Sequence, residues 1–289
     1  MPVIRFDDPT EFAARAMPLL LADEARHNLI LGLCATLARQ PDVYPEFHLW
    51  TVVDAGEPVA VAMRTPPHNL LIGQPRDDQA LPTLAEALHG QGVELPGVTA
   101  ARPEVEQFAE EWRKLSGAMP RQRMALGVYR LTSVLPVSGV PGRMRRAAQS
   151  DRDLLIEWVT AFQDEAVPGH MQTDVQKWAD LRLGDGEGGL FLWEDDGPVS
   201  MAGYGAFTPN GVRVGPVYTP RDFRGRGYAS VLVAEMSSWL LGQGRRFCFL
   251  YTDMANPTSN KIYREIGYEF VCDSSDYVFE AENGARTAG

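Results

Sequence analysis

The chain has 289 residues, 45% of them hydrophobic and 22% charged, which excludes a disordered chain and suffices for one large domain or two ordinary ones. The formal net charge is −11, and acidic residues outnumber basic ones in both halves, so we expect no nucleic-acid partner. The cysteines and histidines lack metal-ligand spacing, and neither a signal peptide nor an apolar run of membrane-spanning length is evident, so we expect a cytoplasmic protein without a metal or a membrane partner.

Hydrophobic patterning predicts a mixed α/β first half. The expected elements are a strand at 3–6, helices at 11–21 and 26–37, hairpin strands at 47–53 and 58–64, a strand at 69–72, helices at 81–89 and 103–115, and strands near 124–134. The segment 135–142 then holds two prolines and two glycines. It can sustain neither a helix nor a central strand, so it predicts a domain boundary.

The second half repeats this order. We expect a strand at 144–148, a helix capped by Ser150, a helix starting near Thr173, hairpin strands at 190–194 and 199–207, a strand at 212–218, a helix at 228–241, a strand at 247–252, a helix at 257–266 and two closing strands. We interpret the repeat as a tandem duplication, with chance similarity between two α/β domains as the alternative.

The clearest functional signal is the loop at 219–229, with the sequence Thr-Pro-Arg-Asp-Phe-Arg-Gly-Arg-Gly-Tyr-Ala, between a predicted strand and an amphipathic helix. Glycines permit a tight turn, and the free N–H groups at a helix start favour an anion, so the pattern indicates a pyrophosphate site. Neither a Walker loop nor a dinucleotide fingerprint fits. Positive charge is added by Arg221, Arg224, Arg226, Arg245 and Arg246.

A second signal runs from Asn256 to Tyr268. Asn256 and Pro257 predict a helix start, and Gly267 predicts its end. Tyr263 lies seven residues after Asn256 and so nearly on the same helix face. Helix capping does not account for this tyrosine, which leaves core packing and a functional role as equal alternatives.

Together the two stretches resemble the GNAT superfamily of N-acetyltransferases. The similarity covers about residues 143–280, with the element order and the separation of the motifs both matching the family. The family's [QR]xxGx[GA] motif is matched by Arg224, Gly227 and Ala229. Its later N-x-x-[AS]-x-x-x-Y-x-x-x-G-[FY] pattern is matched by Asn256, Ser259, Tyr263, Gly267 and Tyr268.

This resemblance implies an α/β fold of two GNAT-like domains, each a mixed, mostly antiparallel sheet flanked by helices. In the family, two strands splay apart and the pantetheine arm of acetyl-coenzyme A fills the gap. The resemblance assigns that arm to the backbone of Val217, Tyr218 and Thr219. It assigns the pyrophosphate to Arg224, Gly225, Arg226, Gly227, Tyr228 and Ala229, and the arm or nucleotide end to Asn256 and Asn260.

The implied chemistry is attack of a neutral amine on the thioester, followed by departure of a thiolate whose pKa is about 8.5. A backbone N–H near Val217 would stabilise the oxyanion, and Tyr263 stands at the family's proton-donor position. Many family members carry a glutamate on the strand before the first motif, but 211–217 contains no acid. The general base therefore stays open, with Asp164, Glu165, Tyr204 and an ordered water as candidates.

The first half lacks both motifs. Its corresponding loop, 73–82, carries acids that would repel a pyrophosphate and has no paired glycines. Arg102 and Pro103 replace the Asn-Pro pair, and no tyrosine follows at the matching turn. We expect 1–135 to be a degenerate GNAT-like domain without the cofactor motif, and 143–289 to be the acetyl-CoA-binding catalytic domain.

We therefore predict a transferase that moves an acetyl or other acyl group from acetyl-CoA to a primary amine without a metal. The acceptor stays open among a small metabolite, an aminoglycoside-like compound, a peptide and a protein amine, and oligomerisation is also open. The alternative is a non-catalytic acyl-CoA sensor, which would not need Tyr263. A tRNA-dependent aminoacyl transferase of similar tandem fold is disfavoured by the acidic charge.

Overall fold

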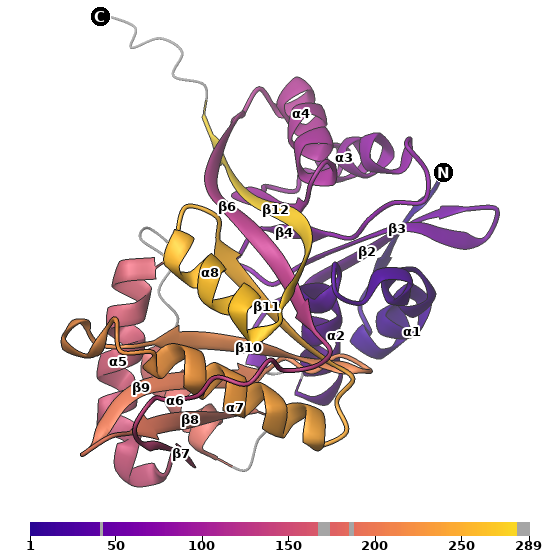
Figure 1. Cartoon of the computed structure of the whole chain (residues 1–289). Helices are drawn as coiled ribbons and strands as arrows, with labels where there is room; N and C mark the ends of the chain where they lie inside the picture. The colour runs from indigo at the N-terminus through magenta and orange to yellow at the C-terminus, as the bar shows by residue number, and fades with distance from the viewer. Residues whose placement is uncertain (41–42, 167–173, 185–187, 282–289) are drawn as a thin grey trace, which may run out of the picture. The chain divides into compact units, whose positions relative to one another are not determined.

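The computed structural model describes residues 1–40, 43–166, 174–184 and 188–281 (Figure 1). The chain forms two compact units: unit 1 comprises Met1–Leu126 and Cys272–Gly289, and unit 2 comprises Gly127–Val271. The division falls inside two strands, β6 (Met119–Leu131) and β12 (Glu269–Glu280), so each of them contributes to both units. The segment 135–142, where the sequence predicts a boundary, belongs to unit 2 as a whole.

Unit 1 starts with a strand, two helices and three further strands. Its elements before β6 are β1 (Val3–Phe6), α1 (Pro9–Leu20), a 3-10 turn η1 (Leu21–Asp23), α2 (Asn28–Arg39), β2 (His48–Asp54), β3 (Glu57–Arg64), β4 (Leu70–Ile72), α3 (Ala80–Gly90), β5 (Gly97–Ala101) and α4 (Glu104–Ser116). Asp8 begins α1 by accepting a hydrogen bond from the Thr10 amide at 2.7 Å, and Gly117 ends α4 in the left-handed conformation.

The main elements of unit 2 follow in the same order. They are β7 (Arg143–Arg146), η3 (Gln149–Asp151), α5 (Arg152–Ala166), α6 (Val175–Leu183), β8 (Gly189–Glu194), β9 (Pro198–Gly205), β10 (Gly211–Tyr218), η4 (Arg221–Phe223), α7 (Tyr228–Gly242), β11 (Phe247–Asp253) and α8 (Pro257–Ile266). The α-helices and strands therefore follow one another in the same order from β1 to β6 and from β7 to β12. This repeated order confirms two domains of the same fold class.

The sheets of the two units also share a pattern. In unit 1 the strand order is β1-β2-β3-β4-β5-β12-β6, and in unit 2 it is β6-β11-β10-β9-β8-β7. The first four strands of each unit pair antiparallel with their neighbours in sequence. β4 pairs parallel with β5, as β10 does with β11. Each unit is thus a mixed, mostly antiparallel sheet.

Helices cover both faces of the unit 2 sheet (Figure 1). Along β8, Phe191 and Trp193 pack in the cluster that includes α7, whereas Leu190 and Leu192 pack with α5. This alternation follows from the two-residue period of a strand. The start of α7 therefore packs against β10 in one core, which fixes their relative positions within the unit.

Three sequence predictions about elements were wrong. The strand β5, Gly97–Ala101, was missed, because its small residues give little hydrophobic signal. The chain closes with one long strand, β12, rather than two, and β6 is likewise a single strand. β12 continues through Asp273–Asp276, although Asp and Ser are common in turns, because Ser274 to Val278 pair with β5. The predicted helix start near Thr173 lies outside the described residues.

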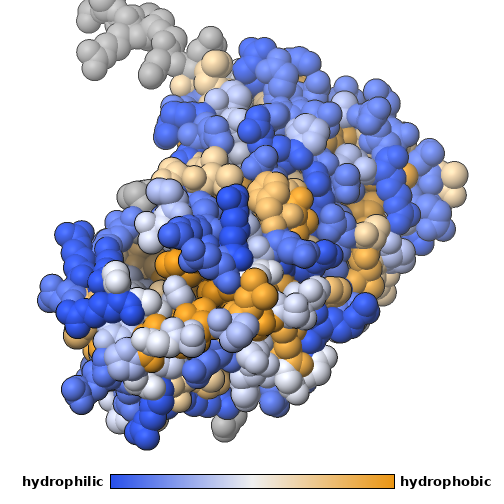
Figure 2. Space-filling model, viewed as in Figure 1, coloured by the Kyte–Doolittle hydropathy of each residue, from blue (hydrophilic) through white to orange (hydrophobic). Residues whose placement is uncertain are grey.

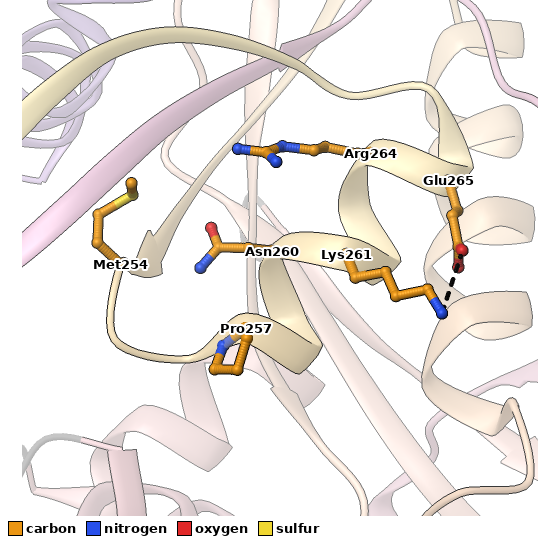
Figure 3. A pocket seen from close by; sticks show the side chains of 6 residues that line it. All are labelled: Met254, Pro257, Asn260, Lys261, Arg264 and Glu265. Carbon is orange, nitrogen blue, oxygen red and sulfur yellow. Dashed lines mark ion pairs between the residues drawn. The ribbon is translucent and has the colours of Figure 1, made fainter.

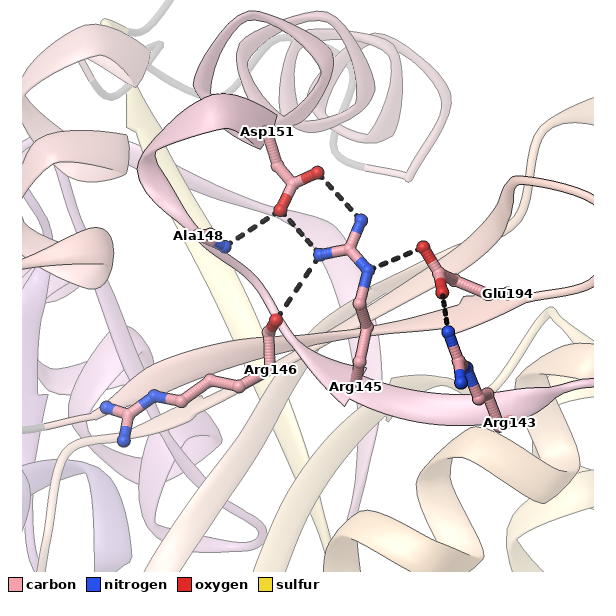
Figure 4. A network of polar contacts seen from close by, with 6 residues as sticks. All are labelled: Arg143, Arg145, Arg146, Ala148, Asp151 and Glu194. Carbon is pink, nitrogen blue, oxygen red and sulfur yellow. Dashed lines mark hydrogen bonds and ion pairs between the residues drawn. The ribbon is translucent and has the colours of Figure 1, made fainter.

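Ser150 was also predicted to cap a helix, but it lies inside η3, whose N-cap is Ala148 and whose third residue, Asp151, bonds back to that cap (Figure 4). Asp151 accepts a hydrogen bond from the Ala148 amide at 2.8 Å and two from Arg145, at 2.6 and 2.8 Å. Arg145 also donates to Glu194 at 2.6 Å. Arg145 lowers the pKa of both carboxyl groups, so they stay ionised and tie β7 to η3 and β8.

Candidate active site

The parallel pairing of β10 with β11 ends early. Its register runs from Gly211 with Phe247 to Arg213 with Phe249, although β10 continues to Tyr218 and β11 to Asp253. Beyond Arg213, one edge of β10 still pairs with β9 and the other no longer pairs with β11. The strand is half-buried from Gly215 onward. An unpaired strand edge offers backbone donors and acceptors to an extended ligand.

An irregularity in β10 lies where this pairing ends. Val214 pairs with Tyr204 and Val217 with Ala202, so the register to β9 shifts between Val214 and Val217. Such a bulge leaves backbone groups outside the ladder and bends the strand. Gly215 has φ +136° there, which favours glycine over other residues. Val217 and Tyr218, both predicted to bind the pantetheine arm, follow the bulge on the part of β10 that pairs with β9 but not with β11.

The loop from β10 to α7 exposes a run of backbone amides. Gly225 and Gly227 adopt left-handed conformations with φ of +76° and +84°. The first hydrogen bond of the helix runs from the Val231 amide to the Gly227 carbonyl, so the preceding amides have no helical acceptor. Within the described residues, no acceptor contacts the amides of 225–230. These amides and the positive end of the helix dipole form an anion site.

The predicted loop arginine Arg224 is already engaged. Its Nε donates to the Thr219 carbonyl at 2.8 Å, and its Nη2 donates to Glu165 Oε2 at 2.7 Å. The guanidinium lies 5.6 Å from the centroid of the Tyr218 ring. Glu165 reaches the loop from α5, a contact that sequence reasoning missed because 59 residues separate the pair.

The other arginines divide into two groups. Arg226 donates to the Asp222 carbonyl at 3.1 Å and stays in the loop. Arg245 and Arg246 follow the C-terminal end of α7, a helix of 15 residues and hence about 22 Å long, where they lie over Phe207 and Phe247. The expectation that these two arginines add charge at the phosphate loop is therefore wrong.

Tyr228 and Ala229 form the first turn of α7. Tyr228 is buried, and its hydroxyl donates a hydrogen bond to Asp195, a partner that sequence reasoning did not identify. That bond raises the pKa of Tyr228. The side chain of Tyr228 is thus used within the protein, which leaves the backbone amides of Tyr228 and Ala229 as the groups that could bind phosphate.

Asn256 and Asn260 organise the start of α8. Asn256 accepts a hydrogen bond from the Ser259 amide at 3.1 Å, which confirms the predicted cap. Asn260 is buried; it donates to the carbonyls of Asp253 and Asn256 and accepts from the Tyr129 hydroxyl at 3.2 Å. Both amide side chains are thus engaged within the chain, and their contact with a cofactor stays a prediction.

Tyr263 is half-buried on α8, beside the core of unit 2. Its ring meets Tyr268 edge to face, with centroids 5.8 Å apart. Burial raises the pKa of Tyr263 to about 12, so its hydroxyl carries its proton at neutral pH. Within the described residues this hydroxyl has no hydrogen-bond partner, in contrast to that of Tyr268, which bonds Ser237 at 2.9 Å.

The candidate general bases lie in different surroundings. Asp164 is exposed, and Tyr204 is buried in an aromatic cluster with Phe191 and Trp239. The hydrogen bond from Arg224 lowers the pKa of Glu165. A carboxylate that is stabilised in this way is a weak base, so the structure disfavours Glu165 for that role. We assign no general base.

A shallow pocket of about 380 Å³ lies beside the first turns of α8 (Figure 3). Arg264 and Asn260 extend toward Met254 on one side, while Lys261 turns toward Glu265. Figure 2 shows apolar surface around α8 and the segment that leads into β7. The large exposed apolar side chains of these parts are Leu135, Met254 and Phe270.

In unit 1, most amides of the loop that corresponds to 219–227 donate hydrogen bonds within the protein. Gly73 donates to the Val61 carbonyl and Arg76 to the Val59 carbonyl, at 3.0 and 2.7 Å. The Gln74 amide donates to His27 Nε2 at 2.9 Å. Further along, the Gln79 and Ala80 amides bond Asp77. Acceptors of the protein itself thus bind most of the amides that would be needed to hold a phosphate.

In unit 1, an ion pair occupies the helix start that corresponds to the second motif. Arg26 lies 2.5 Å from Glu104 at the start of α4; Glu104 is buried, and the side chain of Arg26 is 13% exposed. Arg26 also donates to the Arg102 carbonyl at 3.1 Å, beside Pro103. This ion pair stands where unit 2 has the Asn256 cap. Among the described residues of unit 1, most of the loop amides are therefore engaged, and an ion pair lies at the start of α4.

No group of three or more His, Cys, Asp or Glu side chains that could hold a metal ion occurs among the described residues. No helix within the described part of the chain is long and apolar enough to span a bilayer.

Comparison with known proteins identifies the family of one part of the chain. Residues 153–268 match the sequence model of the Acetyltransferase (GNAT) family, whose members generally transfer acyl groups. No curated protein matches the chain with significant sequence similarity.

Solved structures match nearly the whole chain. A GNAT-family acetyltransferase from Colwellia psychrerythraea has a TM-score of 0.59 at 12% identity, over 97% of this chain and 100% of its own. A GCN5-related N-acetyltransferase from Sphaerobacter thermophilus has a TM-score of 0.60 at 18% identity, over 95% and 94%. A tandem GNAT protein from the clavulanic acid biosynthesis pathway has a TM-score of 0.59 at 13% identity, over 98% and 99%. Residues 153–268 thus form a domain of the GNAT acetyltransferase family, as the two sequence motifs indicated, in a chain with the tandem GNAT fold that the repeated order of elements indicated.

Proposed function

We propose that the protein transfers an acetyl or other acyl group from coenzyme A to a primary amine, at a single site in unit 2. The observation that carries this proposal is the loss of pairing between β10 and β11 after Arg213, directly before a loop whose amides at 225–230 have no acceptor among the described residues. An unpaired strand edge fits the amide-containing pantetheine arm, and the loop amides fit its pyrophosphate.

The proposed reaction forms a bond between the amine nitrogen and the thioester carbonyl carbon and breaks the carbon–sulfur bond. A backbone N–H on the bulged part of β10 near Val217 would stabilise the oxyanion. Tyr263 would donate its proton to the departing thiolate, and its raised pKa keeps that proton available at neutral pH. The proton lost by the amine leaves through a base that stays unassigned.

The acceptor is proposed only as a class. A net charge of −11 suits a cationic amine, because opposite charges steer encounter. Unit 1 is proposed to be a degenerate domain without a cofactor, since its own side chains and carbonyls occupy the matching amides.

The test combines binding and turnover. Calorimetry with coenzyme A should find one site per chain, and release of thiol from acetyl-CoA should depend on an amine chosen from a panel. Gly225→Asp should abolish binding, because it places a carboxylate beside the loop amides.

Gly244→Asp is the matched control. Gly225 and Gly244 both have positive φ, +76° and +87°, with no atom within 4 Å of an added Cβ, but Gly244 follows the far end of α7. Equal binding by the two variants would contradict the proposed site. Binding without turnover on any amine would favour the sensor alternative.

A further inference from the structure

Glu165 brings a negative charge to the loop that we propose for the pyrophosphate. It lies near the end of α5, and its Oε2 accepts a hydrogen bond from Arg224 Nη2 at 2.7 Å. Its Oε1 lies 3.4 Å from Arg221 Nε. One carboxylate thus contacts two of the loop's arginines.

These contacts leave the loop with less free positive charge than its sequence indicates. Arg224 also donates to the Thr219 carbonyl and lies over the Tyr218 ring, so its guanidinium is held toward α5. The pKa of Glu165 is lowered by the hydrogen bond from Arg224, and the carboxylate is charged at neutral pH. Glu165 therefore occupies the position of an anion at these guanidinium groups.

The ion pair between Arg224 and Glu165 is nevertheless weak enough for a phosphate to replace the carboxylate. The side chains of Arg224 and Glu165 are 44% and 30% exposed, and exposed ion pairs between long side chains contribute little to stability. A phosphate group accepts more hydrogen bonds from an arginine than one carboxylate oxygen does. A phosphate that reaches the loop can therefore take over the guanidinium groups.

We propose that Glu165 is an internal competitor of the coenzyme A pyrophosphate for Arg221 and Arg224, and that it lowers the affinity of this site for the cofactor. The inference rests on the proposed function, because it assumes that coenzyme A binds at this loop. Glu165 acts through the two arginines and is not a catalytic residue. Removal of one charge a few ångströms from two phosphates changes affinity by about three- to tenfold at low salt.

The experiment compares Glu165→Gln with Asp164→Asn in the full chain by calorimetry with coenzyme A. Asp164 is the neighbouring exposed acid, and no ion pair or hydrogen bond of its side chain is found among the described residues. Each variant replaces one acid by its amide, so both change the net charge equally. Glu165→Gln should bind coenzyme A about three- to tenfold tighter than wild type, and Asp164→Asn should stay within about twofold. The gain should shrink as salt is added.

Two fragments of the cofactor locate the effect. Dephospho-coenzyme A keeps the pyrophosphate and should show the same gain, whereas pantetheine has no phosphate and should show none. Equal affinities of the two variants, or weaker binding by Glu165→Gln, would overturn the competition. A wild-type chain that binds no coenzyme A would overturn both this inference and the proposed function.

Discussion

Tyr263 and Tyr268 lie five residues apart and pack against each other, yet their hydroxyl groups differ. The Tyr268 hydroxyl is buried and bonds Ser237, so packing and one hydrogen bond account for this residue. The Tyr263 ring packs beside the same core, but packing does not account for its hydroxyl. A protonated hydroxyl without a partner among the described residues is suited to donate a proton to a ligand.

Replacement of Tyr263 by Phe keeps the ring and removes only the hydroxyl. We expect turnover to fall by about 10²-fold or more, with coenzyme A affinity little changed, because general-acid catalysis contributes on this scale. Steady-state kinetics and calorimetry on the same preparation measure the two effects.

Tyr268→Phe is the matched control for that experiment. It removes a buried hydrogen bond and should cost about 1 kcal/mol of stability, with turnover preserved. If Tyr263→Phe kept the wild-type rate on an accepted amine, the proton-donor role would be wrong.

Single residues with local roles could be predicted from the sequence, and those with distant partners could not. The Asn256 cap and the glycine at 227 follow from residue types beside a helix start. The contacts of Glu165 with Arg224 and of Asp195 with Tyr228 join residues 59 and 33 positions apart. No local pattern indicates such pairs, because the packing of helices and strands decides them.

At the scale of elements, the two strand-to-helix loops of the repeat have taken opposite forms. In unit 2, the loop after β10 leaves its amides at 225–230 without acceptors among the described residues. In unit 1, the loop after β4 directs its amides to the protein's own acceptors, among them His27. His27 Nδ1 lies 2.9 Å from the Leu20 carbonyl, so a neutral ring donates there and accepts from Gln74 at Nε2.

This arrangement predicts a pH dependence of stability. Burial lowers the pKa of His27 below 6.5, so the unfolded chain binds the extra proton first as the pH falls. The contribution of His27 is therefore complete above about pH 6.5 and is lost as the pH falls from there toward the lowered pKa. Its protonation would remove the acceptor of the Gln74 amide.

Denaturant unfolding at pH 7.5 and 5.5 measures this effect. The loss of stability between the two pH values should be smaller in His27→Gln than in wild type. His48 and His68, whose pKa values are also lowered by burial, are present in both proteins and cancel in the comparison. Equal losses of stability would show that folding does not change the pKa of His27.

Which elements could be predicted also follows from their physical signals. Amphipathic helices follow from their periodicity, and strands such as β2 and β8 follow from their short, mostly apolar runs. The strand β5 lies in a short run of small residues, and its place in the sheet comes from pairing with β4 and β12. The end of pairing between β10 and β11 is equally invisible to sequence patterns, since strand pairing is not local.

The C-terminal part of β12 is fixed in unit 1 by a buried charge. Asp276 is 3% exposed; it accepts hydrogen bonds from Arg123 at 3.0 Å and from Thr99 at 3.0 Å, and it also bonds Asn69. Arg123 lies on β6 and Thr99 on β5, the neighbours of β12 in the sheet. A buried carboxylate with these partners sets the position of the strand.

Asp276→Asn should therefore destabilise the protein by about 2 kcal/mol or more, because it leaves the Arg123 guanidinium without its charge partner. Asp273→Asn, at an exposed position on the same strand, should change stability by less than about 0.5 kcal/mol. Denaturant unfolding of both variants gives the comparison. Equal stabilities would show that the Asp276 charge does not anchor β12.

At the scale of the whole molecule, each unit is completed by a segment that the sequence assigns to the other half. Unit 2 includes 127–131 of β6, which precede the predicted boundary, and unit 1 includes the residues of β12 from Cys272 onward. Tyr129 and Leu131, fully buried, belong to the core of unit 2. The repeat in the sequence predicts two domains, but it carries no signal for this exchange of strands, because each strand has the same pattern in either position.

The exchange predicts that neither half folds alone. A cut between Ser138 and Gly139 falls in the exposed part of the segment 135–142 and leaves every helix and strand intact. The piece 139–289 then lacks Tyr129 and Leu131, whose loss costs of the order of 2–5 kcal/mol for each side chain, against a total stability of about 5–15 kcal/mol. The piece 1–138 lacks Asp276 and the strand that pairs with β5.

Each piece expressed alone should be insoluble or should unfold without cooperativity. Expressed together, they should form a complex that binds coenzyme A as the intact chain does, since every element of both units is then present. A soluble piece 139–289 that unfolds cooperatively and binds coenzyme A alone would show that unit 2 does not depend on β6, and the strand exchange would then have no part in holding the site together.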